Sequence, residues 1–175
     1  MARHSDLLPQ VVARRANDAG NAVFVQDVGA GSASAAEVHD QALRWADGLV
    51  ASGVRADEPV ATMVPASGAA VALWLGISWA GAFEVPVNPA YFGRLLSDTL
   101  NRIQARILVL DRRWLPPMLD AVADVPGLEL LIVTGPPAPA AVPVPLSRPV
   151  AIVEADELLA AAEARDRPAP TSNQL

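Results

Sequence analysis

The chain has 175 residues, of which 52% are hydrophobic and 18% charged, and it contains no cysteine. The apolar fraction excludes a disordered chain, and the lack of cysteine excludes disulfides, thiolate metal sites and a cysteine nucleophile. A formal net charge of −6 argues against a nucleic-acid partner, because such binding requires a basic face. All 13 basic residues are arginines, so the chain has no lysine.

The first third of the chain predicts a short amphipathic helix, a strand and a long capped helix. The helix is expected over 7–19 and the strand over 22–26, followed by a turn. Ser34 opens the clearest helix, because Glu37 stands three residues later and completes a capping box. Gly53 should end this helix in a left-handed conformation.

After this helix, apolar strands alternate with single helices. We expect strands over 59–64, 84–87, 106–110, 128–133 and 150–153, and helices over 69–81, 92–104, 116–123 and 154–165. In the helix over 92–104, the residues expected to face inward are Phe92, Leu95, Leu96, Leu100 and Ile103. Strands that are apolar on both faces indicate a parallel sheet that is covered on both sides. The predicted fold class is therefore α/β, with a largely parallel sheet and helices on both faces.

The composition divides the chain into three parts. Residues 1–135 are predicted to form an N-terminal α/β subdomain, and residues 136–149 a proline-rich loop. Residues 150–175 are expected to hold one short strand, one helix and an unfinished polar tail. A complete domain would end in a packed element, so the chain is expected to be incomplete at this end.

One uncharged stretch, over 60–83, is similar in length to a membrane span. Pro65 and the pair Ser67-Gly68 interrupt it, so the continuous helical part is too short to cross a bilayer. The N-terminus lacks the apolar stretch of a signal peptide. We therefore expect a soluble cytoplasmic protein without a membrane span.

The glycines between the first strand and the capped helix invite comparison with a dinucleotide-binding fingerprint. Gly29 and Gly31 fit two of its positions, but Ser34 occupies the third glycine position. The acidic residue that should follow about 20 positions later is missing, because Asp57 comes too late. A simple turn into a capped helix is the preferred interpretation.

Other polar residues lack the partners that chemistry requires. The two histidines, His4 and His39, have no catalytic or metal-binding constellation in the sequence, and His39 is expected to face solvent. The pairs Asp57-Glu58 and Asp156-Glu157 suit loops and helix starts, with paired-carboxylate catalysis as the open alternative.

The aromatic residues of the apolar helices suggest packing rather than chemistry. Trp45, Trp74 and Trp79 lie on apolar helix faces and are predicted to be core. Taken by themselves, the residues assign no catalytic, cofactor-binding or metal-binding position.

Four segments, however, follow one another as in a known family. Residues 34–49 are similar to the family's early helix, although the usual aromatic residue near Ala36 is missing. Residues 53–65 are similar to the segment that leads into its next strand, with Asp57-Glu58 in place of Gly-Asp. Residues 74–91 resemble its signature around G-A-x-x-v-P-l-N, and 106–111 its next strand. Order and spacing together resemble the adenylate-forming superfamily of acyl-CoA synthetases, aryl-CoA ligases, luciferases and nonribosomal adenylation domains.

The resemblance implies a two-step reaction. A carboxylate attacks the α-phosphate of ATP to give an acyl-adenylate, and coenzyme A then displaces AMP to form a thioester. The family needs a phosphate loop of the form T-S-G-T-T-G-x-P-K-G, acidic residues for Mg²⁺ and a C-terminal lysine. That loop normally follows a segment like 168–175, and a chain without lysine cannot supply either charged group. No family catalytic residue can be carried onto a position of this sequence.

The resemblance thus implies the N-terminal fragment of an acyl-CoA ligase of fatty acid metabolism, inactive by itself. ATP, Mg²⁺ and coenzyme A are implied only for the full-length enzyme. The expected partners are the missing C-terminal part, or a second copy bound through an apolar sheet edge. One alternative is a self-contained, non-catalytic α/β binding or interaction module, which a packed C-terminal element would favour. Another is one subunit of a split ligase, which co-purification with a lysine-containing ATP-binding protein would favour.

Overall fold

The computed structural model describes residues 7–28, 31–136 and 149–165. They divide into two compact units. The first lies within residues 1–58, 66–83 and 159–175, and the second within 59–65 and 84–158. The proline-rich loop predicted over 136–149 falls almost entirely outside the described residues, so the three-part division stays a prediction.

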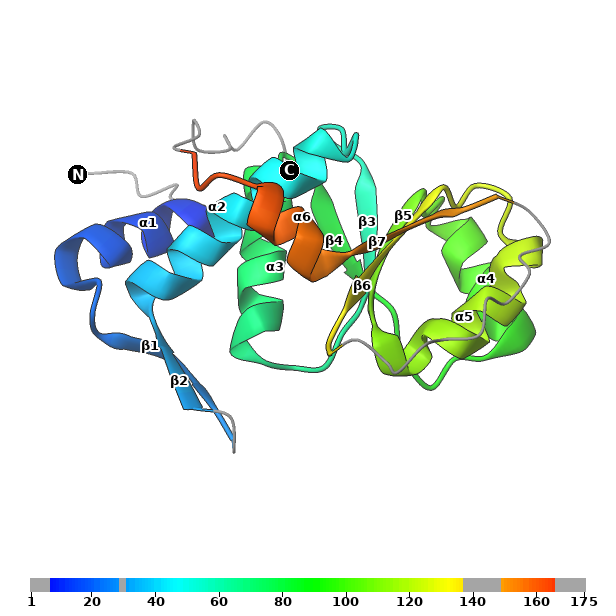
Figure 1. The fold of residues 1–175 in the computed structure, drawn as a ribbon, viewed down its shortest axis with the longest axis horizontal. Coiled ribbons are helices and arrows are strands. Elements are labelled where there is room, and N and C mark those ends of the chain that lie inside the picture. Colours follow the sequence, from blue (N-terminus) through cyan, green and yellow to red (C-terminus); the bar gives the residue numbers. More distant parts are fainter. Residues whose placement is uncertain (1–6, 29–30, 137–148, 166–175) are drawn as a thin grey trace. The chain divides into compact units, whose positions relative to one another are not determined.

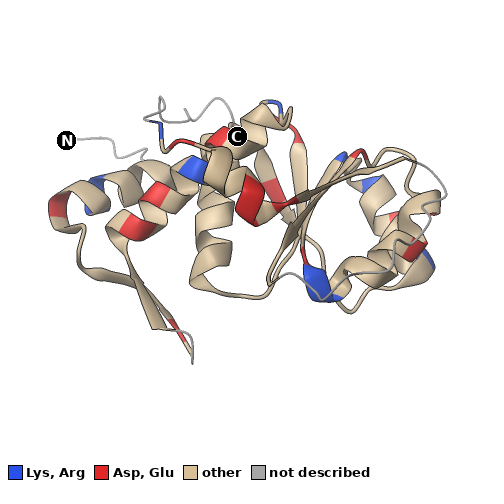
Figure 2. Ribbon diagram, viewed as in Figure 1, with Lys and Arg blue, Asp and Glu red and all other residues tan. Residues whose placement is uncertain are grey.

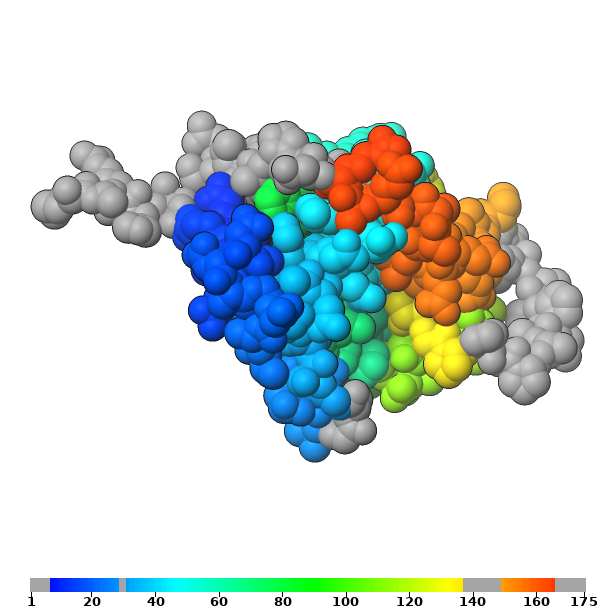
Figure 3. All heavy atoms as spheres, turned by 60° about the vertical axis from the view of Figure 1, so that its left-hand side comes forward, coloured from blue at the N-terminus to red at the C-terminus, as the bar shows by residue number. Residues whose placement is uncertain are grey.

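The first unit combines three helices with a two-stranded hairpin (Figure 1). Its elements are α1 (Leu8–Ala19), β1 (Val23–Asp27), β2 (Gly31–Ser34), α2 (Ala35–Ala51) and α3 (Gly68–Trp79). The capping box predicted at the start of α2 is confirmed, and Gly53 after its end has the expected positive φ of 86°. A space-filling view shows α1 and the hairpin lying along α2 (Figure 3).

Strand β2 was not expected. The residue pattern predicts only a turn between the first strand and α2, because Gly31–Ser34 holds small residues of low strand propensity. The structure pairs this segment antiparallel to β1, with Val25 opposite Ala33. Pairing with the apolar strand β1 supplies the backbone hydrogen bonds that its own side chains do not encourage.

The second unit is built on a five-stranded sheet in the order β4-β3-β5-β6-β7. Its strands are β3 (Pro59–Met63), β4 (Phe83–Pro86), β5 (Ile107–Asp111), β6 (Leu130–Thr134) and β7 (Ala151–Glu154). The pairs β3–β5, β5–β6 and β6–β7 are parallel, as the alternation of strands and helices predicts. The α/β fold class is confirmed.

Short helices follow these strands. Helix α4 (Gly93–Arg102) connects β4 to β5, and η1 (Arg112–Trp114), α5 (Leu115–Ala121) and η2 (Val122–Asp124) lie between β5 and β6. Helix α6 (Ala155–Ala161) comes after β7. Proline occupies the first turn of α5, where backbone N–H groups make no hydrogen bond within the helix, so the N–H that proline lacks is not needed. The predicted helix over 154–165 is too long, because α6 already ends at Ala161.

The core of the second unit lies between one face of the sheet and helices α4 and α5. Alternate strand residues point into it, including Met63, Leu108 and Leu131, and meet Leu100 of α4 and Met118 of α5. The opposite face of the sheet is buried as well, since Val60, Ile107, Val109 and Ile132 have no exposed surface. Burial on both faces is the reason why the central strands β3, β5 and β6 are apolar at nearly every position.

Phe92 and Leu95 contradict the inward set predicted for the helix over 92–104. Leu96 and Leu100 are buried, but Phe92 is 60% and Leu95 56% exposed. The helix starts at Gly93, so Phe92 precedes its first turn and does not follow the inward stripe. Leu95 lies one position before the stripe and turns to solvent.

No helix within the described ranges is long and apolar enough to cross a bilayer. The uncharged stretch over 60–83 forms strand β3, a turn and helix α3, as its Pro65 and Ser67-Gly68 predict.

Candidate functional site

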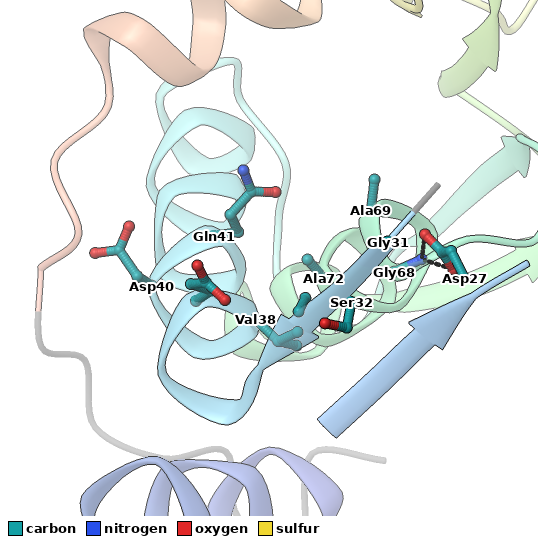
Figure 4. Close-up of a pocket in the computed structure, with 11 residues that line it drawn as sticks. Asp27, Gly31, Ser32, Val38, Asp40, Gln41, Gly68, Ala69 and Ala72 are labelled. Carbon is teal, nitrogen blue, oxygen red and sulfur yellow. Dashed lines mark hydrogen bonds between the residues drawn. The ribbon is translucent and has the colours of Figure 1, made fainter. Parts of the chain in front are cut away.

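A cavity of about 440 Å³ opens in the first unit between the hairpin, the first turns of α2 and the start of α3 (Figure 4). It is lined by Asp27, Gly31, Ser32, Ala33, Glu37, Val38, Asp40, Gln41, Gly68, Ala69 and Ala72. The polar lining comes from the hairpin and α2, while Ala69 and Ala72 of α3 add apolar surface.

Asp27 ties the end of β1 to the N-terminus of α3. Both of its carboxylate oxygens accept the N–H of Gly68, at 2.8 and 3.0 Å. Helix N-termini leave such N–H groups without intrahelical partners, and a carboxylate there also complements the helix dipole. Asp27 thus fills the position at which α3 would otherwise hold an anion.

The two carboxylates of α2 that line the cavity also have partners within the chain. Glu37 Oε2 accepts the backbone N–H and the hydroxyl of Ser34, both at 2.8 Å. The backbone hydrogen bond is the main cause that lowers the pKa of Glu37 below its ordinary value, so the group is ionised at neutral pH. Asp40 accepts the Arg44 Nε–H at 2.9 Å in an exposed pair.

The lining determines what this cavity can hold. It contains three carboxylates and no basic side chain, so hydrogen-bond donors and cations suit it and phosphates do not. Figure 2 shows the acidic segments along α2. Within the described residues, no three His, Cys, Asp or Glu side chains gather as a metal site.

A second polar region lies at the carboxyl ends of the strands in the second unit, where open α/β sheets commonly bind ligands. Asp111, only 8% exposed, accepts the backbone N–H of Arg113 at 3.0 Å and its Nε–H at 2.8 Å. Arg112, at the end of β5, pairs with Glu154, at the end of β7. The charges are neutralised in pairs, so this edge is held together internally.

The fingerprint residues form a hairpin and a helix start. Gly31 opens β2 with a φ of 103°, and the Ser34 hydroxyl accepts the Glu37 N–H at 3.3 Å. Gly29 lies outside the described residues.

His39 and Trp74 depart from their predicted environments. His39 is half-buried rather than solvent-facing, and its ring lies 5.8 Å from the ring of Trp79. Trp45 and Trp79 are core, at 4% and 8% exposed, but Trp74 is 41% exposed and the core prediction for it is wrong. His4 lies outside the described residues.

The acidic pairs occupy the loop and the helix start predicted for them. Asp57, with a φ of 61°, donates its N–H to the carbonyl of Gly81 at 2.8 Å, and Glu58 accepts the N–H of Arg55 at 3.1 Å. The pair Asp156-Glu157 stands exposed in the first turn of α6. The sequence analysis missed Asp27, because its partner Gly68 is 41 positions away and no local pattern links them.

The chain matches the family model described as "AMP-binding enzyme" over residues 12–171. No curated protein matches it. Several solved structures share its fold. The anthranilate CoA ligase AuaEII, in complex with anthranoyl-AMP, superposes with a TM-score of 0.81 at 17% identity, over 95% of this chain and 30% of that one.

Two further structures agree. The long-chain-fatty-acid-CoA ligase FadD1 from Archaeoglobus fulgidus gives a TM-score of 0.79 at 19% identity, over 99% of this chain and 33% of that one. The inhibitor-bound N-terminal domain of FACL13 from Mycobacterium tuberculosis gives 0.67 at 23% identity, over 92% and 37%. The chain therefore spans about a third of the length of these structures.

Proposed function

Since this chain belongs to the family of AMP-binding enzymes, we propose that it forms the N-terminal part of an ATP-dependent acyl-CoA ligase. The observation that carries the proposal is the family match over residues 12–171, and the similarity of fold to CoA ligases supports it. In such an enzyme a carboxylate oxygen attacks the α-phosphate of ATP and pyrophosphate leaves. The thiol of coenzyme A then attacks the acyl carbon and AMP leaves.

The chain's own role in this reaction is that of a framework. A phosphate site needs N–H groups or basic side chains, and Mg²⁺ needs carboxylates that are free to coordinate it. The cavity of the first unit does not fit such a site, because Asp27 occupies the N-terminus of α3 and Glu37 binds Ser34. The chain also contains no lysine. The phosphate-binding and metal-binding groups are therefore assigned to the rest of the ligase.

An isotope-exchange assay tests this assignment. The complete ligase should exchange labelled pyrophosphate into ATP when the correct carboxylic acid is present. The purified 175-residue chain should show no exchange with any acid, because the lysine that neutralises charge on the phosphates is absent. Exchange catalysed by the isolated chain would contradict the framework role, and lack of exchange by the complete ligase would contradict the ligase proposal.

The same proposal extends to substrate class and location. We expect the complete ligase to prefer a fatty acid over an aromatic acid, and a panel of acids from benzoate to palmitate in the exchange assay decides this. The enzyme is proposed to be cytoplasmic, and fractionation of cells that produce it should recover it with the cytosol.

The two alternatives make different predictions. A split ligase predicts that a lysine-containing, ATP-binding polypeptide co-purifies with the chain and restores exchange. A non-catalytic binding module predicts no exchange in any combination.

A further inference from the structure

We propose that the exposed start of helix α4 is an interface covered by the remainder of the ligase, an inference that rests on the proposed function. The surface consists of Phe92 and Leu95 with Pro86, Asn88, Pro89 and Ala90, the exposed residues of the segment that leads into the helix, and we call it the α4 patch. It belongs entirely to the second unit.

The α4 patch is apolar and exposed. Phe92, the residue directly before the first turn of α4, is 60% exposed, and Leu95 within that turn is 56% exposed. Residues 85–93 carry no charged side chain. Single exposed apolar residues are ordinary, whereas two large exposed apolar side chains three positions apart, next to an uncharged segment, are typical of an interaction site.

The backbone of the patch is held in place before any partner binds. The Val87 N–H donates to the carbonyl of Thr62 at 2.7 Å, which fixes the segment to the end of β3. Asn88 then closes a turn, because its Oδ1 accepts the Ala90 N–H at 2.9 Å and its carbonyl accepts the Tyr91 N–H at 3.0 Å. An ordered surface loses little conformational entropy when it binds, which favours association.

Charged residues stand beside the apolar centre. Arg94 and Asp98, one turn apart on α4, form a pair at 3.4 Å with side chains 92% and 63% exposed. An apolar centre with a polar, solvent-accessible rim is the usual anatomy of a protein–protein interface. Helix α4 thus buries Leu96 and Leu100 in the core of the second unit, whereas Leu95 remains available to a partner.

The occupant follows from the lengths of the similar enzymes. AuaEII and FadD1 superpose on 95% and 99% of this chain, which spans only 30% and 33% of them. In each of them, roughly two thirds of the polypeptide lies outside the part that this chain matches, and it is the candidate to cover surfaces of this fold. An apolar surface that a complete enzyme would bury is therefore exposed in the chain by itself. We assign the α4 patch to that contact, whether the rest of the ligase is continuous with this chain or a separate polypeptide.

Cysteine labelling tests the inference, because the chain has no cysteine of its own. Phe92→Cys and Leu95→Cys place a thiol in the α4 patch, and Asp120→Cys on α5 is the matched control at an exposed polar position of the same unit. Maleimide labelling at each site is followed by mass spectrometry, in the isolated chain and in the complete ligase. Circular dichroism verifies that each variant is folded.

The expected result is fast labelling of all three sites in the isolated chain. In the complete ligase, the two patch sites should react about tenfold more slowly relative to Asp120→Cys, because the centre of an interface excludes water and reagents. Unchanged relative rates would overturn the proposal. Slow labelling of the isolated chain that becomes fast on dilution would show that a second copy covers the patch, which also overturns it.

Pyrophosphate exchange on the same samples separates the two proposals. Protection of the patch without exchange would refute the ligase function but leave the interface standing. Exchange without protection would refute the interface alone.

Discussion

Replacing Gly76 with alanine should destabilise the chain, although alanine is the better helix former. Gly76 lies in α3 where it crosses α2, and a Cβ built there would lie 2.4 Å from the Trp45 Cβ and 2.8 Å from the Ala42 carbonyl oxygen. Carbon atoms in contact prefer about 3.5–4.0 Å, so the two helices would have to separate by about 1 Å. Trp45 is only 4% exposed, so the displaced atoms belong to the core.

The two contributions have opposite signs. The intrinsic helix propensity favours alanine by about 1 kcal/mol. Overpacking costs about 1–3 kcal/mol, and here it belongs at the upper end because the clash involves a Cβ and backbone atoms rather than a flexible side-chain tip. The free energy of unfolding should therefore fall by about 2 kcal/mol, which lowers Tm by roughly 4–8 °C in a chain of this size.

Thermal and urea unfolding, followed by circular dichroism, measure this effect. Gly127→Ala is the matched control, because the nearest atom to its added Cβ is 4.0 Å away. The control should change Tm little. A Gly76→Ala chain as stable as the wild type, or more stable, would show that the close approach of α2 and α3 does not exist in solution.

Four further substitutions have defined outcomes. Because the pKa of Glu37 is lowered in the folded chain, its ionised form stabilises the fold at pH values above the ordinary pKa of a glutamate. The free energy of unfolding should therefore fall as the pH drops through the lowered pKa. Glu37→Gln should remove the part of this acid sensitivity that Glu37 causes, which urea titrations at pH 3–6 measure. Asp27→Ala should cost about 1–2 kcal/mol through the lost hydrogen bonds to α3, and denaturation at the same stability as the wild type would contradict the cap. Leu108→Ala should cost about 2–5 kcal/mol in the core, whereas Leu95→Ala in the isolated chain should stay within about 0.5 kcal/mol, so equal losses would refute the assigned exposures.

Much of the second unit could be predicted because its signals are local. The strands at 59–63 and 107–111 are apolar at nearly every position, and only a sheet covered on both faces accommodates such runs. The start of α2 was equally predictable, since Ser34 and Glu37 stand at the spacing of a capping box. These elements follow from the period of hydrophobic residues and from hydrogen bonds spanning three or four positions.

The candidate site was much less predictable. Strand β2 has no strand-forming residues of its own and exists through pairing with β1. The contact of Asp27 with α3 joins residues 41 positions apart, and the orientation of Phe92 depends on where α4 begins. None of these features can be predicted from the types of residues that are close together in the sequence.

The amino-acid sequence by itself determined the α/β class, the order of strands and helices in the second unit and the absence of lysine, because each depends on composition or on nearby residues. Only the tertiary structure decided that Trp74 and Leu95 face solvent, that His39 packs against Trp79, and that three carboxylates line one cavity. Apolar character says that a side chain can be buried, whereas burial itself depends on which neighbouring element reaches it.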